Sequence, residues 1–153
     1  MLRVSFQGER GAYSEAAAFS FFGKKIKTVP LPTFADIIEH TENGKTDYTI
    51  LPVENSLEGS VGESHDLLYS TKLYAVGETY FRIRHCLIGL GPLDKIDTVY
   101  SHPQALGQCR KFIQKHRMKT VPAYDTAGSV QIIKGLNKKN IACLASKIAS
   151  EIY

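Results

Sequence analysis

The sequence predicts an α/β protein built as two similar lobes, each a parallel sheet with helices on its faces. Strand and helix patterns alternate over residues 3–53, and the alternation returns over residues 98–153. Short connections between alternating elements favour parallel strands joined by crossover helices. A strand-like passage over residues 72–91 connects the two series. We therefore expect a first lobe over residues 1–75, followed by the crossover strands and a second lobe over residues 76–153.

The first lobe is expected to contain three strands and two helices. The strands cover residues 3–7, 26–31 and 48–53, and the helices cover residues 13–22 and 33–44. Ser14 and Thr33 are the expected N-caps, and Asp36 stands at the third helical position, as in a capping box. Gly23 and Gly44 follow the two helices, where a glycine commonly ends a helix.

A further helix is expected at residues 60–70, before the crossover, and the second lobe is expected to contain three strand–helix pairs. The strands cover residues 98–101, 119–124 and 140–145, and the helices cover residues 103–116, 126–136 and 146–153. Pro103 suits the first turn of its helix, with Ser101 as the expected cap. The last helix reaches Tyr153 without a glycine stop, so we expect the natural polypeptide to continue.

Composition favours an ordinary globular protein with a small anionic ligand. The chain has 153 residues, 43% of them hydrophobic and 22% charged, and a formal net charge of +4. Lys and Arg are scattered, so we expect no nucleic-acid partner, and no apolar run is long enough to predict a membrane span. Without a secretion signal at the start, the cytoplasm is the expected location. Cys86, Cys109 and Cys143 lack metal-binding spacing and are expected to be reduced and mostly buried.

Small and polar residues collect just past the predicted strand ends. In open parallel α/β sheets, ligands bind outside the carboxyl ends of the strands. Helix N-termini at that edge offer unpaired N–H groups to an anion. The pattern therefore predicts a site for a small molecule with two carboxylates. The residues concerned are Gly8–Ser14, Pro32–Thr33, Glu54–Ser56, Ser101–Gln104 and Asp125–Ser129.

Helix capping is the alternative explanation for several of these residues, and it suffices for Ser14, Thr33 and Thr126. It does not suffice for Glu54–Ser56, because a cap needs one polar side chain and this segment supplies three. Surplus polar groups near a sheet end need partners or a ligand. Gln108 is likewise unexplained by packing, and we expect it to lean toward the start of its helix.

Four segments resemble, in order and spacing, the signature segments of prephenate dehydratases. They are GERGAYSEAAA, LPVENSLEGSV, SHPQALGQC and DTAGSV, and IACLASKIASEIY resembles the segment that follows them. LPVENS and SHPQALGQC are the specific ones. The resemblance covers essentially the whole chain. It implies a two-lobed, type 2 periplasmic-binding-protein-like fold with the active site in the cleft, and conversion of prephenate to phenylpyruvate with loss of water and carbon dioxide in phenylalanine biosynthesis.

The resemblance also implies roles for individual residues. Catalytic roles fall to Glu54, Asn55, Ser101 and Gln108, with Glu54 either a proton donor or an orienter of its neighbours. Substrate contacts fall to Ser56, Tyr13, Ser14, Asp125, Thr126 and Ala127. Capping of its own helix is the alternative for Asp125. The reaction needs no metal, nucleophile or redox cofactor, so we expect no metal site and no cofactor.

Two features of the family are missing from the sequence. An Asn-x-Thr-Arg-Phe motif on a returning strand and a C-terminal ACT domain, which binds phenylalanine, do not occur here. The resemblance therefore implies a truncated catalytic region, and the activity of the isolated chain stays open. It implies a homodimer as well. An arogenate dehydratase and a non-enzymatic binding module for small anions are the alternative functions.

Overall fold

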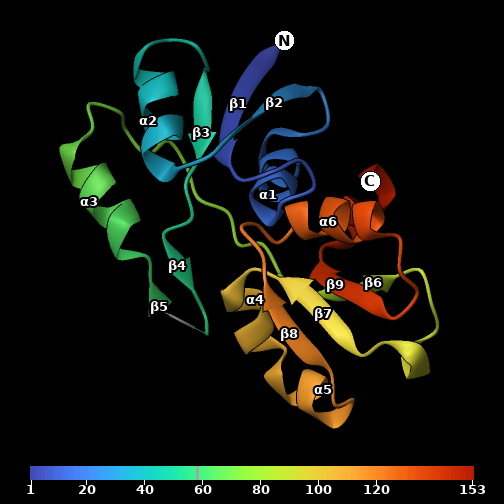
Figure 1. Cartoon of the computed structure of the whole chain (residues 1–153). Coiled ribbons are helices and arrows are strands. Elements are labelled where there is room, and N and C mark those ends of the chain that lie inside the picture. Colours follow the sequence, from blue (N-terminus) through green and yellow to red (C-terminus); the bar gives the residue numbers. More distant parts are fainter. Residues whose placement is uncertain (58) are drawn as a thin grey trace. The chain divides into compact units, whose positions relative to one another are not determined.

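The computed structural model describes residues 1–57 and 59–153, which form two compact units (Figure 1). The first unit comprises Met1–Glu9 and Tyr13–Arg82. The second comprises Ile83–Tyr153 and, from the start of the chain, the short piece Arg10–Ala12. In the described part of the chain, no helix has the length and apolar character that crossing a membrane requires.

The first unit is built on a parallel sheet with the strand order β2-β1-β3. Its strands and helices are β1 (Leu2–Gln7), α1 (Tyr13–Phe22), β2 (Ile26–Leu31), α2 (Phe34–Glu42) and β3 (Tyr48–Ile50). A short antiparallel hairpin of β4 (Glu54–Asn55) and β5 (Gly59–Ser60) follows, and then helix α3 (Gly62–Ser70). The parallel β-α-β-α-β order predicted for residues 3–53 is confirmed.

The two helices α1 and α2 cover opposite faces of this sheet. Val4 packs with Ala18 of α1, whereas the hydroxyl of the next residue, Ser5, donates to the carbonyl of Ile37 in α2. Successive side chains of a strand point to opposite faces, which explains the division. The α2 N-terminus has the predicted capping box, in which Thr33 Oγ1 accepts from the N–H of Asp36 at 3.1 Å.

The second unit is built on a four-stranded sheet with the order β6-β9-β7-β8. Its elements are β6 (Cys86–Gly89), a short 3-10 turn η1 (Leu93–Lys95), β7 (Thr98–Ser101), α4 (Pro103–Gln108), α5 (Arg110–Lys115), β8 (Lys119–Pro122), α6 (Gly128–Leu136), β9 (Ile141–Ala145) and α7 (Lys147–Ile152). Strands β7, β8 and β9 are parallel, and β6 runs antiparallel to β9. The carboxyl ends of three strands therefore meet at one edge.

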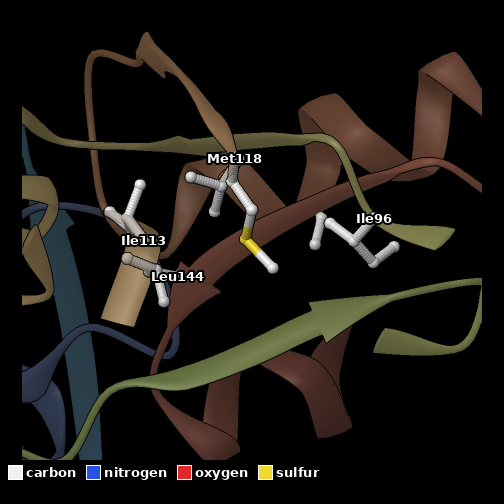
Figure 2. Packing of buried hydrophobic residues seen from close by; sticks show 6 residues of the cluster. Ile96, Ile113, Met118 and Leu144 are labelled. Atoms are coloured by element: carbon white, nitrogen blue, oxygen red, sulfur yellow. The ribbon is translucent and has the colours of Figure 1, made fainter. Parts of the chain in front are cut away.

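Strand β9 is buried along its whole length because both of its faces are covered. Leu144 packs on one side with Ile96, Ile113 and Met118, as Figure 2 shows. On the other side, the neighbouring Cys143 packs against residues of α6 and α7. A strand covered on both faces reads as a continuous apolar run, which is the pattern of IACLA.

Most predicted elements match the observed ones to within two residues at each end, and three differ more. The strand predicted over residues 48–53 ends at Ile50, because Pro52 has no N–H to give to a ladder. The passage 72–91 contains a single strand, β6. Residues 72–85 find no strand partner among the described residues, and an extended pattern forms a strand only where a neighbour supplies hydrogen bonds. The helix predicted over residues 103–116 is divided at Cys109 into α4 and α5.

Three predicted caps are also corrected. Ser14 lies inside α1, which begins at Tyr13. Ser101 is the last residue of β7, and the ring nitrogen Nδ1 of His102 accepts from the N–H of Gln104 instead. Thr126 precedes Ala127, which stands at the cap position of α6. The N–H of Gly128 donates to the carboxylate of Asp125 instead.

Candidate functional site

The predicted site residues divide between the two units. In the first unit, Glu54 and Asn55 form strand β4 of the hairpin, opposite Ser60 and Gly59. Asn55 is half-buried, and its Oδ1 accepts from the backbone N–H of Leu57 at 2.9 Å. This Asx turn fixes the side chain and engages its oxygen. Within the described residues the Asn55 side chain makes no other hydrogen bond, so its NH₂ group is the part available to a ligand.

Glu54 and Ser56 flank Asn55 and are both exposed to solvent. An exposed carboxyl and an exposed hydroxyl on a two-strand hairpin carry little packing function. Glu54 and Ser56 therefore face solvent on either side of Asn55, whose side chain is fixed by the turn.

Tyr13 and Ser14 occupy the first turn of α1 and are half-buried. Sequence reasoning missed their neighbour Glu15, which is only 3% exposed and accepts from Thr28 Oγ1 at 2.7 Å. A carboxylate in the first turn of a helix interacts favourably with the backbone N–H groups there. In the sequence, the position of Glu15 in the first turn of a predicted helix, within the segment YSE, could have indicated this role.

In the second unit, Ser101 is completely buried at the carboxyl end of β7. Its hydroxyl donates to the carbonyl of Leu144 in the adjacent strand β9 at 2.7 Å. Ser129 of α6 donates to Thr126 O at 2.6 Å and approaches the same Leu144 carbonyl at 3.5 Å. These hydroxyls connect the strand ends to the turn that begins α6.

Asp125, Thr126 and Ala127 form that turn. Asp125 Oδ1 accepts from the N–H of Gly128 at 2.7 Å, which is the capping alternative left open by the sequence. Ala127 is 1% exposed and packs in the core with α6 and β9. The capping carboxylate occupies the helix N-terminus that a ligand carboxylate would otherwise use.

Gln108 closes α4 and is half-buried. Its Oε1 lies 2.8 Å from Nε2 of His85, the residue just before β6. Sequence reasoning singled out Gln108 and missed His85. A histidine at the end of a strand-like run gives no sign of its partner, because the pairing joins residues that are 23 positions apart.

The glycine-rich turn GERG contributes a packing contact to the second unit. Gly11 has a φ of +84°, and Ser146 Oγ, the cap of α7, donates to its carbonyl at 2.6 Å. A Cβ built on Gly11 would stand 2.7 Å from the Cα of Ala149. Both the backbone conformation and the close approach of α7 therefore require glycine here.

Cys109 and Cys143 are not activated thiols. Burial raises the pKa of the Cys109 thiol, and it raises the pKa of Cys143 to about 11. A thiol with a raised pKa holds little of the thiolate that attacks substrates or binds metals. Among residues 1–57 and 59–153, no group of three or more His, Cys, Asp or Glu side chains is placed to hold a metal ion.

The two α/β units, each with parallel strands and a polar carboxyl edge, define a protein of the type 2 periplasmic-binding-protein-like fold class. A nutrient-binding protein from Burkholderia cenocepacia, solved with bound methionine, shares the fold with a TM-score of 0.50 at 8% identity, covering 99% of this chain and 74% of that one. The solved prephenate dehydratase of Staphylococcus aureus subsp. aureus Mu50 matches with a TM-score of 0.83 at 24% identity, over 99% of this chain and 57% of that one. A family profile described as prephenate dehydratase matches residues 4–153, and the chain belongs to that family.

Two curated relatives agree with this assignment, and one similar solved chain carries a different description. A bifunctional chorismate mutase/prephenate dehydratase of Enterobacter agglomerans is 37% identical, covering 99% of this chain and 41% of the relative. An arogenate dehydratase/prephenate dehydratase of Arabidopsis thaliana is 38% identical, over 99% and 39%. A solved chain described as a quorum-quenching acylase has 34% identity and a TM-score of 0.88, over 98% and 55%. The chain thus spans about two fifths of the length of these curated relatives.

Proposed function

We propose that the protein catalyses the decarboxylative dehydration of prephenate to phenylpyruvate, in the biosynthesis of phenylalanine. The observation that carries the proposal is the family match, which extends over residues 4–153. The residues described above supply amide, hydroxyl and carboxyl groups in both units. These are the groups that the chemistry requires.

The reaction is an elimination that restores aromaticity to the ring. Prephenate carries a ring carboxylate, and a hydroxyl at the opposite ring position. The carboxylate leaves as carbon dioxide, its electron pair passes through the ring, and the carbon–oxygen bond of the hydroxyl breaks. A proton delivered to the departing hydroxyl makes water. A positioned donor at that oxygen contributes about 10²–10⁴-fold to such a step.

In the first unit we assign substrate contact to Asn55 and Ser56. The Asx turn supports this assignment for Asn55, since it engages the side-chain oxygen and leaves an NH₂ donor in a fixed position. Glu54, exposed beside it, is assigned as the proton donor or as an orienter of the hairpin. Tyr13 and Ser14 are assigned to binding at the first turn of α1.

In the second unit we assign catalysis to Gln108, whose amide is anchored at one end by His85. Ser101, for which the resemblance implied a catalytic role, is assigned a positioning role, in which its buried hydroxyl fixes the end of β7 against β9. The backbone N–H groups of Thr126 and Ala127, in the turn before α6, are assigned to substrate contact. Asp125 is assigned to the same turn, where its carboxylate also caps α6.

The test is turnover of prephenate by the complete polypeptide that contains this chain, followed by the absorbance of phenylpyruvate. We expect Asn55→Ala and Gln108→Ala to lower kcat/KM by about 10²-fold or more, the scale of a lost preorganised donor. Asn43→Ala and Gln131→Ala remove exposed amides elsewhere in each unit and serve as matched controls. Ligand binding without turnover by the wild type would instead support a non-enzymatic binding module.

Two further activities should be measured with the same protein. The Arabidopsis relative named for arogenate as well as prephenate makes arogenate the first comparison, decided by the ratio of kcat/KM values. The 34% identical chain described as an acylase makes acyl hydrolysis the second. If kcat/KM for arogenate or for acyl hydrolysis exceeds that for prephenate, the proposed activity changes to that reaction.

We further propose that the protein works in the cytoplasm as a homodimer on this small-molecule substrate. Three unpaired cysteines support a reducing compartment. Cell fractionation tests the location. Sedimentation of the complete polypeptide tests the dimer, and a monomer at assay concentrations would contradict it.

A further inference from the structure

We infer that His85 is a positioning residue that selects which end of the Gln108 side-chain amide is presented to the ligand. The inference rests on the proposed function, in which Gln108 contacts the substrate. Its observation is the 2.8 Å contact between His85 Nε2 and Gln108 Oε1, made inside the second unit.

The chemistry of an amide makes this selection consequential. The two ends of a Gln side chain have nearly the same shape and opposite polarity, one accepting and the other donating hydrogen bonds. A half-turn about the last side-chain bond exchanges them. An anionic substrate with a departing hydroxyl requires the donating NH₂ end, and an exposed carbonyl oxygen would repel it.

His85 removes this ambiguity because Gln108 Oε1 accepts hydrogen bonds only. The contact therefore requires a proton on His85 Nε2, which directs the oxygen toward the imidazole and the NH₂ group away from it. The other neutral tautomer, with the proton on Nδ1, would favour the reversed amide. The tautomer of one ring thus determines the polarity that Gln108 presents.

The backbone on both sides of the pair is held by regular structure. His85 precedes Cys86, which is paired with Ala145 of the buried strand β9. Gln108 ends α4, where the N–H of Cys109 donates to the Ala105 carbonyl. An unanchored Gln side chain has several rotatable bonds, and ordering it on binding costs free energy. The hydrogen bond to His85 orders it beforehand.

A spectroscopic experiment tests the pair without any substrate. Proton–nitrogen correlation spectra of the complete polypeptide, with labelled histidine, report which ring nitrogen carries the proton. We expect His85 to be protonated at Nε2 in the wild type and to lose that preference in Gln108→Leu. Protonation at Nδ1 alone in the wild type would overturn the inference, whether or not prephenate is turned over.

Kinetics then test the positioning role. His85→Leu is expected to lower kcat by roughly 10–100-fold with a smaller change in KM, the scale of a misplaced catalytic group. His85→Gln retains a donor at the position of Nε2 and should recover most of the rate, whereas His85→Asn is too short and should not. His65→Leu, at an exposed histidine of α3, is the matched control.

A double-mutant cycle separates positioning from stability. In a Gln108→Leu background, His85→Leu should cause no further loss of kcat, since no amide remains to be oriented. Equal losses in both backgrounds, or wild-type kcat in His85→Leu, would overturn the inference. If His85→Leu fails to fold, the comparison of His85→Gln with His85→Asn decides. A wild-type protein without turnover refutes the proposed function and leaves the spectroscopic test standing.

Discussion

Replacing Gly11 by alanine tests the packing of the GERG turn against α7. Gly11 has a φ of +84°, and an added Cβ would stand 2.7 Å from the Cα and 3.0 Å from the N of Ala149. Those neighbours are backbone atoms of a helix, so no side-chain rotation relieves the contact. Relief requires that the turn or the start of α7 move.

The cost has two parts. A left-handed conformation costs an alanine about 1–2 kcal/mol. Overpacking against atoms that cannot rotate away costs about 1–3 kcal/mol more. The expected loss in the free energy of unfolding is therefore about 2–5 kcal/mol, the sum of these two ranges.

Gly23→Ala is the matched control, because Gly23 has a similar φ of +80° and no atom within 4 Å of its would-be Cβ. Gly23→Ala should lower the free energy of unfolding only by the cost of the left-handed conformation, about 1–2 kcal/mol. Urea denaturation followed by circular dichroism measures both variants. If the units unfold separately, the Gly11 effect belongs to the transition of residues 83–153. Equal losses for the two variants would refute the packing argument.

Two other predictions concern stability. Thr33→Ala removes the capping box of α2 and should cost about 1 kcal/mol, visible as a lower midpoint in urea, whereas Thr33→Ser should retain most of the stability. Hydrogen bonds from Arg3, at 2.8 Å for the guanidinium, lower the pKa of Asp47 from 3.8 to about 2. Because the folded pKa is the lower one, the stabilisation is present above pH 3.8 and is lost as the pH falls toward 2. Asp47→Asn should flatten this acid limb, and an unchanged limb would show that the pair contributes nothing.

Local signals predicted the fold well where they are strong. Alternating patterns predicted the parallel sheet of the first unit and the three parallel strands β7, β8 and β9 of the second. They did not predict that β6 joins the second sheet antiparallel to β9, which makes that sheet mixed. The Thr33-x-x-Asp36 spacing predicted the cap of α2. Local signals failed where tertiary contacts decide. Residues 72–85 carry a strand pattern without a described strand partner. The division at Cys109 follows Gly107, a weak helix former, and lets Ile113 of α5 reach the core.

The hydrogen bonds of the candidate site residues could be anticipated from the sequence only in part. The rule about strand ends indicated Asn55, and Gln108 was singled out because packing on its helix does not explain it. The hydrogen bonds of the two residues are of different kinds. The Asx turn at Asn55 is local and can be anticipated from sequence. The partner of Gln108 comes from a distant segment, and the burial of Ser101 depends on its place at the end of β7 beside β9.

The piece Arg10–Ala12 gives the second unit a discontinuous chain, and this has a consequence during synthesis. The hydrogen bond from Ser146 to Gly11 spans 135 positions. During synthesis, Gly11 therefore leaves the ribosome long before Ser146 has been added to the chain. The turn stays exposed until helix α7 has been synthesised, and contacts of such long sequence separation slow folding. We expect nascent chains that end before Ser146 to leave this turn open to proteolysis.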